Sequence, residues 1–131
     1  MTERLEVLLG IHDIPLNKVV SRLLRKSHEV SAVATLKEMS QMLGIVEGVS
    51  YAEQCRYAVV IMDVNLDSPG ADNIAPGREI YQYLQPLIEG RQVKFTTVSG
   101  NDAVVEKALR EGIPCVPKPN GILEYIRALQ Q

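Results

Sequence analysis

The sequence has 131 residues, of which 46% are hydrophobic and 23% are charged, and its formal net charge is −2. This composition is typical of a globular protein, and the length suffices for one domain with its own hydrophobic core, over residues 1–131. No long run of like charges points to direct nucleic-acid binding. No apolar stretch approaches the roughly 18–20 residues that cross a membrane, so a membrane-embedded protein is excluded.

The first residues and the two cysteines predict a cytoplasmic location. The N-terminal sequence carries Glu3 and Arg4 and lacks the apolar stretch of a secretory signal. Cys55 and Cys115 form neither a disulfide framework nor a zinc-ligand pattern. We therefore expect two free thiols in a reducing compartment.

Apolar strand patterns alternate with helical patterns along the chain. Strands are predicted at residues 5–11, 30–34, 57–62, 93–98 and 113–116. Helices are predicted at residues 15–24, 36–43, 80–87, 102–109 and 122–129. Residues 65–77 are dense in turn-forming residues and are predicted to be a loop. This alternation predicts an α/β fold, with a parallel sheet covered by helices on both faces.

The first predicted helix has an apolar stripe and a basic end. The stripe consists of Leu16, Val19, Val20, Leu23 and Leu24. Arg22, Arg25 and Lys26 follow near its C-terminus, where positive charge complements the helix dipole. His28, just before the next strand, is expected to be solvated.

Polar side chains gather where the predicted strands end. The apolar run 57–62 stops at Asp63, and Asp13, Thr97 and Lys118 each follow or close another strand. Because the carboxyl ends of parallel strands share one edge of the sheet, we expect these residues to meet there. Two carboxylates repel each other unless a cation holds them, and oxygen ligands suit Mg²⁺. A nucleophile, a metal, a hydroxyl and an ammonium together are what formation of an aspartyl phosphate requires.

The chain resembles the receiver domain of bacterial two-component response regulators over essentially its whole length. The motifs that carry the resemblance are Val7–Asn17, Val59–Leu66, Phe95–Val98, Ala108–Gly112 and Lys118–Pro119. The resemblance implies a flavodoxin-like fold: a doubly wound, five-stranded parallel sheet of order 2-1-3-4-5 with five helices. It also implies that the chain is a phosphoacceptor regulator rather than an enzyme, with at most slow self-dephosphorylation.

The resemblance assigns a phosphoacceptor and a metal site. Asp63 would accept a phosphoryl group from a histidine kinase or a phosphotransfer protein. Asp13 and Asp63 would ligate Mg²⁺ together with the backbone carbonyl of Asn65. His12 stands where the family usually has a second acid, and a cationic imidazole there would weaken Mg²⁺ binding.

The resemblance also assigns the remaining roles. Thr97 would bind a phosphoryl oxygen, with Ser99 as a close rival for that position. Lys118 would pair with the phosphoryl group, and Pro119 would follow a cis peptide bond. The first helix would dock the phosphodonor, and the last two helices would dock an unidentified downstream protein. The sequence does not decide whether the protein forms a homodimer. It also does not decide between a stand-alone receiver and a piece of a larger regulator.

Three further features depart from the family pattern. Val98 occupies a position that is usually Ala or Gly, and its bulk would narrow access to the phosphorylation pocket. Cys115 stands where an aromatic residue is common, and we expect a small buried side chain. The loop 67–76 is longer than usual, so Asp67 and Asp72 could approach the metal, although a solvated loop is expected.

Three rival functions deserve comparison. A haloacid-dehalogenase phosphatase would have a second acid in place of Asn65 and its nucleophile on the first strand. A flavodoxin-like binder of FMN or cobalamin would need a phosphate-binding loop or a metal-binding run that is absent. The strongest alternative is a pseudo-receiver, which has the fold but is not phosphorylated and acts only as a protein–protein interaction module.

Overall fold

The computed structural model describes residues 4–45, 55–67 and 73–129. The strands are β1 (Glu6–Gly10), β2 (Glu29–Val33), β3 (Val59–Asp63), β4 (Lys94–Ser99) and β5 (Cys115–Pro117). The helices are α1 (Ile14–Arg25), α2 (Leu36–Met42), α3 (Ala75–Glu89), α4 (Asp102–Arg110) and α5 (Asn120–Leu129).

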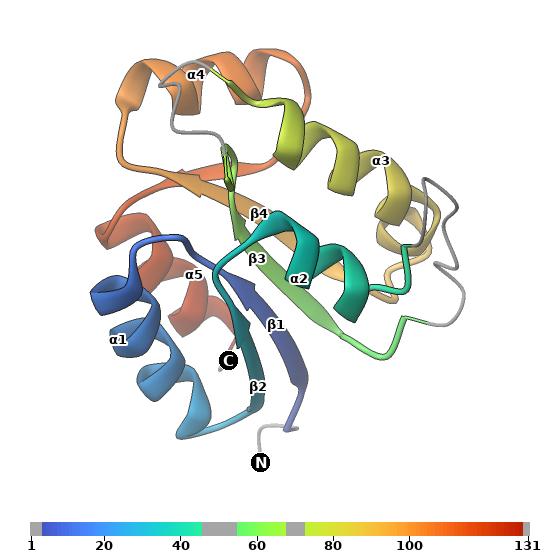
Figure 1. Ribbon diagram of the computed structural model, residues 1–131, viewed down its shortest axis with the longest axis vertical. Helices are drawn as coiled ribbons and strands as arrows, with labels where there is room; N and C mark the ends of the chain where they lie inside the picture. The colour runs from blue at the N-terminus through green and yellow to red at the C-terminus, as the bar shows by residue number, and fades with distance from the viewer. Residues whose placement is uncertain (1–3, 46–54, 68–72, 130–131) are drawn as a thin grey trace.

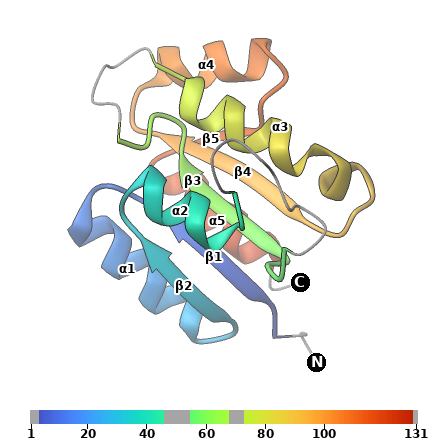
Figure 2. The same cartoon turned by 45° about the vertical axis from the view of Figure 1, so that its right-hand side comes forward.

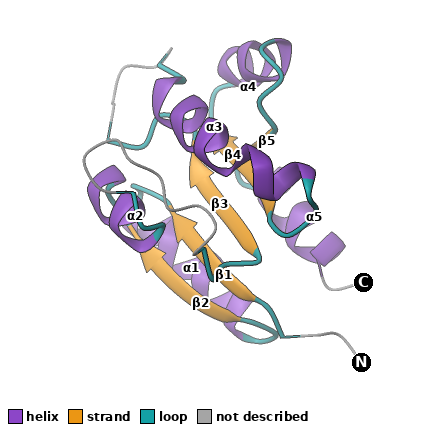
Figure 3. Cartoon of the chain, turned by 90° about the vertical axis from the view of Figure 1, so that its right-hand side faces the viewer, coloured by secondary structure: helices purple, strands orange, loops and turns teal. Residues whose placement is uncertain are grey.

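All five strands belong to one parallel sheet with the order β2-β1-β3-β4-β5 (Figure 1). Helices α1 and α5 cover one face of this sheet, and α2, α3 and α4 cover the other (Figures 1 and 3). Figure 2 shows α3 and α4 together above the half of the sheet that contains β4 and β5. The predicted flavodoxin-like fold and its strand order are therefore confirmed.

Strand β3 is the centre of the sheet and pairs with β1 on one side and β4 on the other. All five of its residues are buried, because helices cover both of its faces. A strand in this position must be apolar on both sides, which explains its unbroken hydrophobic sequence. Asp63 is the exception, and it is the last residue of the strand, at the carboxyl end of the sheet.

The loop after β3 is shorter than the sequence suggests. Residues Ala75–Gly77, predicted to be loop, form the first turn of α3, where Pro76 is tolerated because the first turn does not use its missing N–H group. Gly77 is buried there, and a Cβ atom at this position would lie 2.9 Å from side-chain carbons of Val64 and Thr97. The helix therefore starts close against the sheet only because residue 77 has no side chain.

Two predictions about α1 and the residues after it are wrong. Val19 was expected in the apolar stripe but is 53% exposed, and the buried face instead consists of Asn17, Val20, Ser21 and Leu24. His28 was expected to be solvated but is fully buried, because its Nδ1 atom accepts a hydrogen bond from the Leu5 N–H group at the start of β1.

The cysteine prediction agrees with the structure. Cys55 and Cys115 are both free, and Cys115 is buried as a small side chain in the sheet. No helix among the described residues combines the length and the hydrophobicity needed to cross a membrane.

Candidate functional site

Asp63 lies at the carboxyl end of β3 and is only 3% exposed. The pairing of Gly10 with Met62 brings the chain that follows β1 alongside this carboxylate. There the backbone N–H group of His12 donates a hydrogen bond of 2.7 Å to Asp63 Oδ2. The loop after β1 therefore fixes the orientation of the carboxylate.

Lys118 provides the charge that balances Asp63. Its Nζ atom lies 2.5 Å from Asp63 Oδ1, and both side chains are largely buried. The Lys118 ammonium is the partner of Oδ1, which has no other hydrogen-bond partner among the described residues. The Lys118 N–H group donates to Ser99 O, and the Lys118–Pro119 peptide bond is cis, as the resemblance implied.

The remaining oxygen donors at this edge suit Mg²⁺. Asp13 is the N-cap of α1, and its Oδ1 atom accepts a hydrogen bond from the Leu16 N–H group. Its other carboxylate oxygen makes no such contact within the described ranges, and Asn65 follows Asp63 in the next turn. No three His, Cys, Asp or Glu side chains of the described residues come together. Two carboxylates and a carbonyl are hard oxygen ligands, and Mg²⁺ usually keeps several waters, so the donor set fits this ion.

Asn17 is a site residue that the sequence reasoning missed. Its Nδ2 group donates to the carbonyl oxygens of Ile11 and Val33, and its Oδ1 atom accepts from the Ser21 hydroxyl. Asn17 thus holds the end of β1, immediately before His12 binds Asp63. Polar residues at positions 17 and 21 fall on the buried face of α1, and this spacing was the signal available in the sequence.

Thr97 and Ser99 both lie at the end of β4, but neither hydroxyl is hydrogen-bonded to Asp63 in the part of the chain that the structure describes. The Thr97 hydroxyl donates to the carbonyl oxygen of Pro114 at 2.7 Å. The Ser99 hydroxyl accepts from the Asn101 N–H group. Thr97 also pairs in register with Cys115, whose thiol pKa is raised by burial and lowered to a smaller extent by a hydrogen bond with Thr97.

Neither protein-family models nor curated proteins gave a match to this sequence. Solved structures do match it. The receiver domain of sensor histidine kinase PA1611 from Pseudomonas aeruginosa, solved with magnesium in its active-site cleft, is 26% identical, with a TM-score of 0.65. That match covers 98% of this chain and 96% of the other. The chain has the fold of a receiver domain.

Two further structures carry the same fold. Chemotaxis response regulator CheY4 of Vibrio cholerae is 17% identical, with a TM-score of 0.60 over 97% of this chain and 99% of its own. The receiver domain of Saccharomyces cerevisiae Ssk1, crystallised with the phosphotransfer protein Ypd1, is 14% identical, with a TM-score of 0.66. That match covers 99% of this chain and 91% of the other.

Within this fold, Val98 borders Asp63. It pairs in register with Asp63, so the two side chains lie on the same face of the sheet, and Val98 is fully buried. A side chain larger than Ala or Gly therefore packs directly beside the Asp63 carboxylate.

The side chain of Asp67 binds the N-terminus of α2 in this structure. Its Oδ2 atom accepts a hydrogen bond from the Leu36 N–H group at the start of that helix, and its φ angle is +64°. An acid near a helix N-terminus satisfies a backbone donor that lacks an intrahelical partner. The Asp67 carboxylate, which the sequence suggested could approach a metal, is therefore engaged in capping α2. Asp72, the other acid suggested for the metal, lies outside the described residues.

Proposed function

We propose that Asp63 accepts a phosphoryl group, with Mg²⁺ as cofactor, from a histidine kinase or phosphotransfer protein. The modification would switch a surface that binds a downstream protein. The observation that carries this proposal is the environment of Asp63: a buried carboxylate held by the His12 N–H group, with an ammonium group 2.5 Å from its other oxygen.

The chemistry follows from these contacts. An Asp63 oxygen attacks the phosphorus of a phosphohistidine, the phosphorus–nitrogen bond breaks, and the released imidazole takes up a proton. The product is an acyl phosphate on Asp63. Lys118 already lies against Oδ1, so its charge is available to the phosphoryl oxygens as negative charge builds up on them. The Thr97 hydroxyl would bind a phosphoryl oxygen after leaving Pro114 O.

The metal site would use the oxygen atoms of Asp13, Asp63 and Asn65, with the Asn65 contribution made by its backbone carbonyl. When bound, Mg²⁺ supplies positive charge that offsets the repulsion between carboxylates and phosphoryl oxygens. The magnesium ion coordinated in the PA1611 receiver domain supports this assignment. His12 makes its contact with Asp63 through the backbone, so its side chain is the weakest candidate for a ligand.

Receiver domains are phosphoacceptor regulators rather than classical enzymes, and we assign this chain the same role. The complex of Ypd1 with the Ssk1 receiver domain supports a phosphotransfer protein as donor. The two free cysteines support a reducing, cytoplasmic compartment.

Intact-protein mass spectrometry after incubation with acetyl phosphate tests the proposal. We expect wild type to gain the mass of one phosphoryl group in Mg²⁺ and to stay unmodified in EDTA. Asp63→Asn should stay unmodified in both conditions. Asp67→Asn is the matched control, because it changes the nearby exposed acid of the same type and should be modified like wild type.

Two outcomes would contradict the proposal. One is an adduct that persists in Asp63→Asn. The other is that wild type forms no adduct with acetyl phosphate and also forms no adduct with beryllofluoride in Mg²⁺. The second result would favour the pseudo-receiver, which acts through protein–protein contacts alone.

A further inference from the structure

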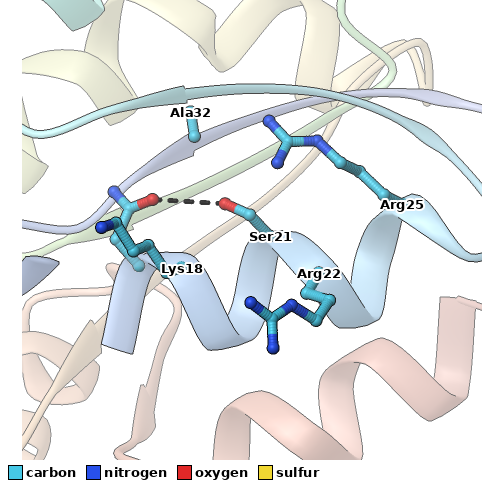
Figure 4. Close-up of a pocket in the computed structure, with 6 residues that line it drawn as sticks. Lys18, Ser21, Arg22, Arg25 and Ala32 are labelled. Carbon is cyan, nitrogen blue, oxygen red and sulfur yellow. Dashed lines mark hydrogen bonds between the residues drawn. The ribbon is translucent and has the colours of Figure 1, made fainter. Parts of the chain in front are cut away.

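A cavity of about 300 Å³ lies between α1 and β2, and Asp63 is not among the residues that line it. The residues that line this basic pocket are Asn17, Lys18, Ser21, Arg22, Arg25 and Ala32. Figure 4 shows Arg25 reaching from α1 towards Ala32 on β2, whereas the Arg22 guanidinium lies on the other side of the helix. Its size falls at the lower end of the range for small-molecule sites.

The pocket concentrates positive charge without balancing it. Lys18, Arg22 and Arg25 form no ion pair with an acidic side chain among the described residues, although the whole chain carries a net charge of −2. Helix α1 contains no acidic residue, and Glu29, the acid of β2, pairs with Arg4. The helix dipole accounts for cations in the last turn, but Lys18 lies in the first half of the helix.

Spacing makes this arrangement unfavourable in the absence of an anion. Lys18 and Arg22 are four residues apart, and Arg22 and Arg25 are three apart, so like charges lie next to each other on the helix surface. A ligand that neutralises all three would relieve this repulsion. The pocket is therefore electrostatically suited to an anion with several charges.

The floor of the pocket is polar, and its side chains are hydrogen-bonded within the protein. Asn17 and Ser21 are buried and hydrogen-bonded to each other, as the dashed line at Ser21 in Figure 4 shows. Asn17 Nδ2 is also fully used by two backbone carbonyls. The floor thus has few donors left for a ligand, and recognition must come from the ammonium and guanidinium groups. Guanidinium groups bind phosphate oxygens through paired hydrogen bonds.

We infer that the basic pocket binds a small molecule that carries a diphosphate group. Three cations around a small cavity match the charge of a diphosphate better than that of a single carboxylate. A cavity with a polar floor suits a small molecule better than the flat acidic surface of a partner protein. This inference is independent of phosphorylation at Asp63.

Nuclear magnetic resonance titration with inorganic pyrophosphate tests the inference, at constant ionic strength and in EDTA so that no metal takes part. We expect saturable shifts of the backbone amides of Asn17, Ser21 and Ala32. Arg22→Gln combined with Arg25→Gln should weaken binding roughly tenfold or more, because two of the three positive charges that line the pocket are lost. Lys94→Gln combined with Arg110→Gln removes the same charge elsewhere and should bind like wild type.

Shifts that do not saturate would overturn the inference, and so would equal weakening by the two double variants. Binding should persist in Asp63→Asn, so this result is separate from the failure or success of phosphorylation. Flotation with vesicles of phosphatidylcholine and phosphatidic acid distinguishes the source of the phosphate. Vesicle binding that Arg22→Gln with Arg25→Gln abolishes, in the absence of saturable pyrophosphate shifts, would overturn the small-molecule ligand and assign the pocket to a lipid phosphate.

Discussion

Val98 lies beside Asp63, and its side chain can limit the rate at which small molecules reach the proposed phosphoacceptor. Because Val98 pairs with Asp63 and is fully buried, its two methyl groups fill space beside the carboxylate. Val98→Ala should therefore speed both phosphorylation by acetyl phosphate and loss of the phosphoryl group several-fold. It should also lower the free energy of unfolding by roughly 1.5–2 kcal/mol, for two buried methyl groups. Time courses by intact mass and urea denaturation measure the two effects.

Val59→Ala is the matched control for this prediction. Val59 belongs to the same hydrophobic cluster and is also fully buried, but it lies at the opposite end of β3. It should lose comparable stability while its phosphorylation kinetics stay unchanged. Equal rates in Val98→Ala and wild type would show that the valine does not limit access.

At the scale of elements, α1 is tied to the sheet by a polar side chain rather than by an apolar one. Asn17 joins the helix to the ends of β1 and β2 through Ile11 O and Val33 O. The next residue after Ile11 is His12, whose N–H group binds Asp63. The position of the Asp63 carboxylate therefore depends on a chain of hydrogen bonds that begins inside α1.

Asn17→Ala should break this chain. Ile11 O would lose its donor in a buried place, whereas Val33 O keeps the Ile11 N–H group, so we expect a loss of about 2–3 kcal/mol in the free energy of unfolding. The amide hydrogen of His12 should also exchange faster with solvent, because the loop that presents it is no longer fixed. Urea denaturation and hydrogen–deuterium exchange provide the two measurements.

Ser21→Ala provides the comparison. The Ser21 hydroxyl binds only Asn17 Oδ1, so its removal leaves both carbonyl contacts intact and should cost about 0.5–1.5 kcal/mol. Exchange at His12 should stay as in wild type. Unchanged exchange in Asn17→Ala would mean that Asn17 has no role in holding the loop.

At the scale of the whole molecule, the alternation of short apolar strands with helical patterns predicted a parallel sheet covered by helices on both faces. The family resemblance supplied the strand order, which the structure confirms. The apolar run before Asp63 forms the buried central strand β3, as expected. Placing Asp13, Asp63 and Lys118 at one edge required only parallel strands. The ion pair of Asp63 with Lys118 then followed from the topology.

The errors arose where local pattern and tertiary packing disagree. Val19 and Val20 are adjacent apolar residues, and only contact with the sheet decides which of them is buried. His28 is polar, so nothing local indicated that the first strand would cover it. These outcomes are set by contacts between distant segments.

His28 has a consequence for the stability of the entire molecule. Burial, and to a smaller extent the charge of Arg4, lowers the pKa of His28 from its ordinary value of 6.5. The unfolded chain takes up a proton at this residue as the pH falls through 6.5, and the folded protein resists doing so. The free energy of unfolding should therefore fall below this pH, by up to about 1.4 kcal/mol per pH unit, until His28 is also protonated in the folded state.

Urea denaturation in the absence of Mg²⁺, at several values between about pH 7.5 and 5.5, isolates histidine from the carboxylates. His28→Asn keeps an acceptor for the Leu5 N–H group but cannot titrate, so its stability should change little over this range. The sequence contains two histidines, and the other one, His12, is exposed. His12→Asn should keep the pH dependence of wild type. If His28→Asn instead loses stability as steeply as wild type, the titrating group lies elsewhere and the buried imidazole is not the cause.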